Sequence, residues 1–173
     1  MADETDFSRL VGETVTALCH PVYRESTGVI DLDVLTESGR VYRFVTETFD
    51  GERVEAGWTC EHFSLILKEL DEPQSQDDRT NLVGTVTSVQ VIRADEWLGP
   101  VDQSLDSWGV DPREVFTAKA GLGPSSAQVT TVVSGVLLSS DRWRLLVKTH
   151  GFWLHVDFTT DARAVDEFLD HYT

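Results

Sequence analysis

The chain has no long apolar run, only two cysteines and few basic residues. Because no segment approaches the roughly 18 to 20 apolar residues of a membrane-spanning helix, we expect no membrane association. The sequence MADETDFSRL carries acids where a secretory signal has Lys or Arg, and no apolar segment follows it, which predicts a cytoplasmic protein. A chain of 173 residues can bury a sufficient core without disulfides or metal ions. We therefore predict a single domain, 1–173.

Basic residues are scattered singly along the sequence. The 14 Lys and Arg residues stand against 30 Asp and Glu residues, which gives a formal net charge of −16. Nucleic-acid binding requires a basic stripe that replaces counterions along the phosphates, so the sequence predicts no nucleic-acid partner. Three interpretations of the acidity remain open: adaptation to salt, a solvated surface without a special role, and a face that binds a basic protein.

Catalytic and nucleotide-binding motifs are missing as well. The sequence contains no G-x-S-x-G elbow, no Walker loop, no H-E-x-x-H motif and no dinucleotide fingerprint. The segment GLGPSS, residues 121–126, lacks the lysine of a phosphate-binding loop. Asp31 and Asp33 could serve as acid and base or as cation ligands, but their alternation with apolar residues favours a solvated strand face. These observations weigh against an enzyme.

Two Cys–His pairs supply the ligand types of a tetrahedral zinc site. They are Cys19 with His20 and Cys60 with His62. Neighbouring residues of a strand point to opposite faces, so Cys19 and His20 could share an ion only if Pro21 bends the chain. No C-x₂-C knuckle accompanies either pair. We expect both cysteines to be small buried side chains, and we predict no metal and no cofactor.

Alternation of apolar and polar residues predicts a mainly β protein. Two hairpins are expected, one at 28–48 with Gly39 in its turn and one at about 129–148 with a turn at SSD. The segment 64–70 fits either a strand or a helical turn, because it is too short for periodicity to decide. Further strands are expected at about 13–23, 54–60 and 84–93, and in GFWLHVDF at 151–158.

Two helices complete the predicted fold. A C-terminal helix follows a capping Thr and Asp, and Val165, Phe168 and Leu169 share one of its faces. A short helix is expected in DPREVFTAKAG at 111–121, with Asp111 as its N-cap. The predicted fold is an antiparallel sheet, rolled into a barrel or folded as a sandwich, with the C-terminal helix packed over one face.

The sequence also suggests an internal repeat. Two pairs of segments resemble each other in the same order: LVGETVT at 10–16 with LVGTVT at 82–87, and VLTESGRVYRFV at 34–45 with LLSSDRWRLLV at 137–147. This order predicts two similar halves, 10–70 and 82–173, joined by a polar linker at 71–81. Short strand–turn–strand units also resemble each other by chance, so that interpretation stays open. A repeat names no function.

Tryptophans among polar residues are the best candidates for a contact surface. In GFWLHVDF, Trp153, His155 and Asp157 share the face opposite the apolar one. Trp97 and Trp108 lie in and beside a long insertion, where they would either form a recognition loop or cover the core. The favoured hypothesis is a non-enzymatic acidic protein-binding module, of the inhibitor or immunity-protein type, with a basic partner.

Two other classes of function remain open. One is a small-ligand binder or hydrolase-like enzyme that uses Cys60, His150 and His155 in a barrel pocket. The other is a salt-adapted structural domain of a larger assembly, in which the acidity serves solvation. The sequence does not determine the oligomeric state.

Overall fold

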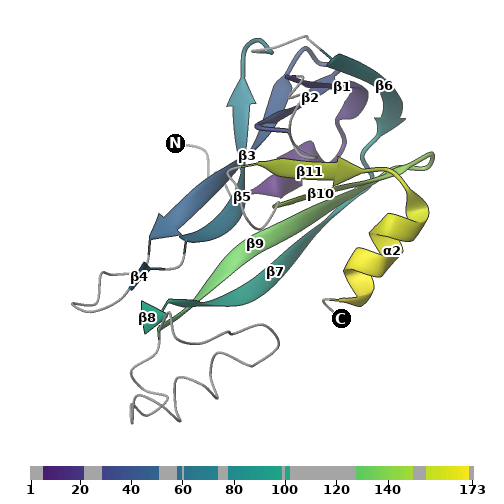
Figure 1. Ribbon diagram of the computed structural model, residues 1–173. Coiled ribbons are helices and arrows are strands. Elements are labelled where there is room, and N and C mark those ends of the chain that lie inside the picture. Colours follow the sequence, from purple (N-terminus) through teal and green to yellow (C-terminus); the bar gives the residue numbers. More distant parts are fainter. Residues whose placement is uncertain are drawn as a thin grey trace.

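The protein is mainly β, with two antiparallel sheets and a C-terminal helix (Figure 1). The computed structural model describes residues 6–21, 29–50, 58–59, 61–73, 78–98, 100–101, 128–149 and 155–171. No helix in these ranges is long and apolar enough to cross a membrane. The two antiparallel sheets and the C-terminal helix confirm the predicted fold class, and the division into two sheets is consistent with a sandwich. The predicted helix at 111–121 lies outside the described residues.

The first sheet contains five strands in the order β5-β3-β2-β1-β6. Their bounds are β1 Thr14–His20, β2 Leu32–Thr36, β3 Val41–Asp50, β5 Glu61–Leu70 and β6 Asp78–Thr85. All neighbouring pairs are antiparallel. The segment 64–70 is a strand, because its residues pair with β3 from Val41 onward. Pairing with a distant strand decides between the two conformations that the short local pattern allows.

The second sheet contains four strands in the order β11-β10-β9-β7. Their bounds are β7 Ser88–Leu98, β9 Gln128–Ser139, β10 Arg144–Thr149 and β11 Val156–Thr159. Two short strands, β4 Trp58–Thr59 and β8 Pro100–Val101, pair separately. Both expected hairpins are present, as β2–β3 and β9–β10. Gly39 has a φ of +86° in the first turn, a conformation that glycine adopts without a steric penalty.

One apolar core lies between the sheets. The first sheet contributes buried side chains such as Leu32 and Phe44, and the second contributes Val136, Leu145 and Val156. Successive side chains of a strand point to opposite faces of its sheet, so the residues between these core residues do not belong to this cluster. Removal of these apolar side chains from water is the main stabilising contribution to such a fold.

In the described part of the chain, one continuous segment passes from the first sheet to the second. β6 pairs with β1, and β7 pairs with β9. Between them, the Val86 amide donates to the Glu13 carbonyl at 2.9 Å, and the Thr87 amide donates to the Ser139 carbonyl at 2.8 Å. Adjacent amides therefore bond to different sheets, so the chain passes from one sheet to the other at Val86. The buried Val86 side chain belongs to the shared core.

The C-terminal helix α2, Ala162–Asp170, is confirmed. The Asp161 side chain accepts a hydrogen bond from the Ala164 amide at 2.8 Å, which caps the first turn. Val165 is fully buried and packs with Leu137 and Leu146 on the face of the second sheet away from the shared core. Phe168 lies over Gly135, where an added Cβ would be 3.0 Å from the ring. A side chain at position 135 would therefore require the Phe168 ring to shift.

The N-terminal element is a short 3₁₀ helix, η1 Phe7–Leu10. Phe7 and Leu10 are buried in the shared core, and the Phe7 ring stacks on Phe44 with centroids 6.0 Å apart. Asp6 caps the element by accepting from the Ser8 amide at 3.0 Å. This element therefore closes one end of the core.

Each sheet contains a four-strand meander in the same order along the chain. The strands are β1-β2-β3-β5 in the first sheet and β7-β9-β10-β11 in the second. This order is compatible with the predicted repeat, which stays a prediction. The predicted linker 71–81 overlaps a strand, because β6 begins at Asp78. β6 is a terminal strand with mostly exposed side chains, so polar residues occupy it without a cost in burial.

Gly84 allows the second hairpin to pack against β6. A Cβ at this position would lie 2.7 Å from Nε1 of Trp143, which stands in the β9–β10 turn. Within the described part of the chain, this indole nitrogen is buried and has no hydrogen-bond partner. We predict that Gly84→Ala lowers the free energy of unfolding by about 1–3 kcal/mol, because Trp143 must move. Urea denaturation followed by circular dichroism measures the change.

The control is the double variant Gly84→Ala/Trp143→Phe, compared with Trp143→Phe alone. Phenylalanine lacks the indole nitrogen, so the alanine should cost less in this background. An equal cost in both backgrounds would show that the clash with Trp143 is not its cause.

Candidate functional site

The predicted contact residues are only partly within the described structure. Trp108 and Trp153 lie outside the described residues. Trp97 is in β7, in register with Val129 of β9. His155 and Asp157 lie at β11, as the alternation predicts, with Val156 between them buried in the core. The role of Trp97, Trp108 and Trp153 in binding a partner stays a prediction.

Asp157 is engaged within the chain. Its carboxylate is 4.0 Å from Nζ of Lys148, and that nitrogen lies 5.5 Å from the centroid of the Phe168 ring. The His155 carbonyl accepts a hydrogen bond from Thr46 Oγ1 at 3.1 Å, which links β3 to the beginning of β11. These contacts tie β11 to α2 and to the first sheet, so a structural role for this part of the predicted surface is already evident.

The candidate zinc ligands are not brought together by the described structure. Cys19 is fully buried in β1, and burial raises the pKa of its thiol. The neighbouring His20 packs against the Phe158 ring, with centroids 5.3 Å apart, and its Nε2 lies 4.0 Å from Asp78. Cys60 lies outside the described residues, and His62 is in β5, opposite Phe49. The residues that are described contain no group of three or more potential metal ligands.

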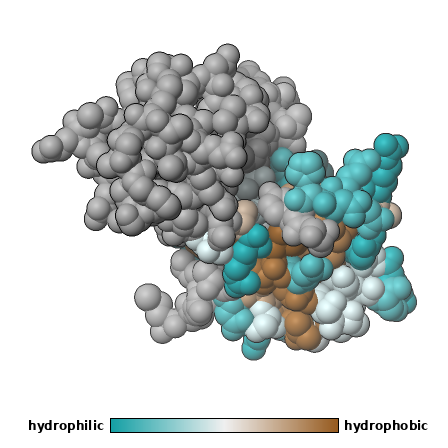
Figure 2. Space-filling view, turned by 90° about the horizontal axis from the view of Figure 1, so that it is seen from below, coloured by the Kyte–Doolittle hydropathy of each residue, from teal (hydrophilic) through white to brown (hydrophobic). Residues whose placement is uncertain are grey.

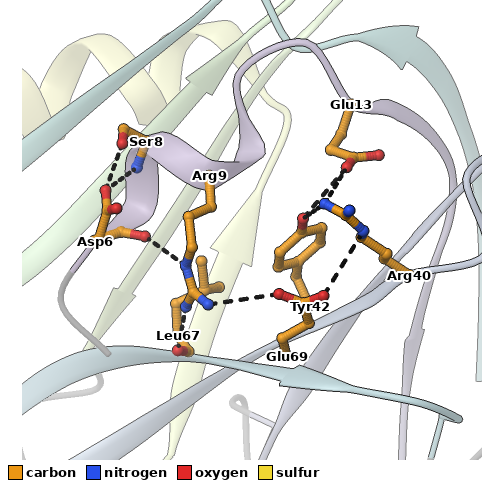
Figure 3. Close-up of polar contacts among 8 residues, drawn as sticks. All are labelled: Asp6, Ser8, Arg9, Glu13, Arg40, Tyr42, Leu67 and Glu69. Carbon is orange, nitrogen blue, oxygen red and sulfur yellow. Dashed lines mark hydrogen bonds and ion pairs between the residues drawn. The ribbon is translucent and has the colours of Figure 1, made fainter. Parts of the chain in front are cut away.

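A polar network surrounds the end of the core near η1 (Figure 3). The Tyr42 hydroxyl donates to Glu13 Oε1 at 3.3 Å, and Arg40 Nη1 lies 3.3 Å from the same carboxylate oxygen. Ser38 Oγ donates to the other Glu13 oxygen at 2.7 Å. Arg40 also reaches Glu69, with Nε 3.7 Å from Oε1. The network therefore joins the start of β1, the β2–β3 turn and the end of β5.

Arg9 extends this network to η1. Its Nη1 is 3.6 Å from Glu69 Oε2, and its Nη2 donates to the Leu67 carbonyl at 2.9 Å. Its Nε donates to the Asp6 carbonyl at 3.1 Å. Figure 3 shows Arg9 and Arg40 on either side of Glu69. The alternating charges hold η1 over the core.

Burial controls the chemistry of Tyr42. The residue has no exposed surface, and this burial raises the pKa of its phenol. The hydrogen bond to Tyr42 and the nearby carboxylates raise the pKa of the Arg40 guanidinium. Tyr42 is therefore a neutral donor at neutral pH, while Arg40 keeps its charge. Such an arrangement fixes the Glu13 carboxylate in place.

A second polar cluster lies on the face of the first sheet away from the shared core. Asp33 and Arg43 are only 2% and 5% exposed. Both carboxylate oxygens of Asp33 accept hydrogen bonds from Arg43, each at 2.7 Å. Arg43 Nη1 lies 3.7 Å from the partly exposed Asp31 carboxylate. This two-pronged geometry is the strongest form of a carboxylate–arginine contact.

The prediction of a solvated strand face is therefore wrong for Asp33, whereas Asp31 is partly exposed. Asp33 is buried because Arg43 on the paired strand neutralises it and satisfies both of its oxygens. The hairpin register contained the signal for this pair. With the turn centred near Ser38, the register that joins Leu35 to Val41 also places Asp33 opposite Arg43.

The described surface contains apolar side chains among polar ones. Figure 2 shows apolar side chains side by side in one patch, with hydrophilic ones around it, on the described part of the face seen from below. The most exposed large apolar residues among those described are Val11, Ile30 and Val83, at 48%, 41% and 53%. Exposure of these three residues alone does not define a docking site.

The fold and these two clusters define the class of the protein as an antiparallel two-sheet β protein with a C-terminal helix. No protein-family model, curated protein or solved structure gives a significant match to the chain.

The buried Asp33–Arg43 pair makes a direct prediction for stability. Arg43→Met leaves the Asp33 carboxylate buried without its partner, and we expect a loss of about 3–5 kcal/mol in the free energy of unfolding. Arg144→Met is the matched control, because Arg144 pairs with Asp166 at 2.8 Å on the exposed surface. That change should cost less than about 1 kcal/mol. Equal losses for the two variants in urea denaturation would contradict the structural importance of the buried pair.

The position of Asp31 predicts how the stability of the fold depends on pH. Partial burial raises its pKa, and this effect exceeds the opposing attraction of Arg43. The protonated form therefore favours the folded state, and this contribution is lost as the pH rises from about 3.9, the unfolded value, through the raised folded value. We predict that Asp31→Asn increases stability relative to the wild type more at pH 7 than at pH 4.

Urea denaturation at both pH values measures this difference. Glu47→Gln is the control, because it removes an exposed carboxylate from the same sheet. A relative stability of Asp31→Asn that falls between pH 4 and pH 7 would mean that attraction to Arg43 dominates over burial.

Proposed function

We propose that the chain is a non-enzymatic acidic protein-binding module of the inhibitor or immunity-protein type. Its partner would present a basic surface, and both proteins would meet in the cytoplasm. The observation that supports this proposal is the distribution of charge: most of the described basic side chains lie within ion-pair distance of the protein's own carboxylates, while other described acids are exposed and have no such partner in these pairs.

Most of the described basic side chains lie within ion-pair distance of a carboxylate. The pairs are Arg9–Glu69, Arg40–Glu13, Arg43–Asp33, Arg142–Asp141, Arg144–Asp166, Lys148–Asp157 and Arg163–Glu167. With a formal net charge of −16, the acids outnumber these partners. The resulting negative potential attracts positively charged proteins and increases their rate of association.

Three exposed acids lie at the end of the first sheet that holds the polar network. Glu37 lies in the β2–β3 turn, where its amide donates to the Thr14 carbonyl at 2.8 Å. Asp71 and Glu72 directly follow Leu70, which pairs with Val41 at the same end. All three acidic side chains are exposed. We call these three residues the acidic end.

Arg9 and Arg40 partly neutralise this region through Glu13 and Glu69. Neither arginine neutralises the charge of the acidic end, because both are already engaged in the network. A basic partner would therefore gain new ion pairs at the acidic end without competing for those that stabilise the fold. This separation of structural from available carboxylates favours a binding surface.

The test is purification from cells that naturally produce the protein, at low and high salt, with mass determination of the co-eluting species. We expect a stoichiometric basic protein that dissociates as salt rises, because screening weakens exposed charge pairs. The double variant Asp71→Asn/Glu72→Gln should reduce its affinity by several-fold. The charge-matched control Glu47→Gln/Asp170→Asn removes two exposed carboxylates elsewhere and should have a smaller effect.

Two outcomes would contradict the proposal. Recovery of the protein alone at low salt would show that it binds no basic partner in those cells. Unfolding of the pure protein at low salt, with recovery near molar salt, would instead favour the salt-adapted domain, since self-repulsion is then the dominant effect of the acids. Circular dichroism against salt concentration separates this second outcome from simple loss of a partner.

A further inference from the structure

We draw no further inference here: the strongest candidate, the outer edge of the terminal strand β6 with its exposed Val83, carries nothing because nothing among the described residues shows what covers it.

Discussion

Burial of one apolar core between two antiparallel sheets is the interaction on which the other features depend. Phe44 of the first sheet and Val136 of the second belong to the same buried cluster, although they are far apart in the sequence. The chain crosses between the sheets at Val86, whose side chain is part of that cluster. Because the sheets are fixed against each other in this way, the turns of both hairpins and the N-terminal element acquire defined positions, and the polar groups around them can form specific contacts.

The charged residues serve two different purposes in this arrangement. Arg43 neutralises a carboxylate that the fold has buried, and Arg9 and Arg40 hold the N-terminal element through Glu13 and Glu69. These cations are therefore committed to the protein itself. In a chain with so few basic residues, their commitment leaves much of the surface negative. This pairing of arginines with the protein's own carboxylates stabilises the fold and leaves the negative charge that would attract the proposed basic partner. The same negative charge also fits adaptation to salt.

Much of the fold was predictable because local patterns carry the information. The β2–β3 hairpin follows from alternation around Gly39, and α2 follows from its capping Asp161 and its apolar face. The candidate site was less predictable. Alternation placed Asp33 on the face away from the core correctly, but it suggested solvent there, since it contains no information about Arg43 on the partner strand. The polar network could not be predicted either, because it joins segments from η1, the β2–β3 turn and β5.

The sequence by itself determined the strand and turn propensities, the C-terminal helix and the large negative charge, since each depends on residues close in the chain or on composition alone. The tertiary structure decided that 64–70 is a strand, that the strands divide into two sheets, and that Asp33 is buried while the acidic end is exposed. These outcomes depend on which distant segments pair and on what then excludes water. Local periodicity determines which face of its strand a side chain lies on. Burial and charge pairing depend in addition on the neighbouring strands and side chains, which come from distant parts of the sequence.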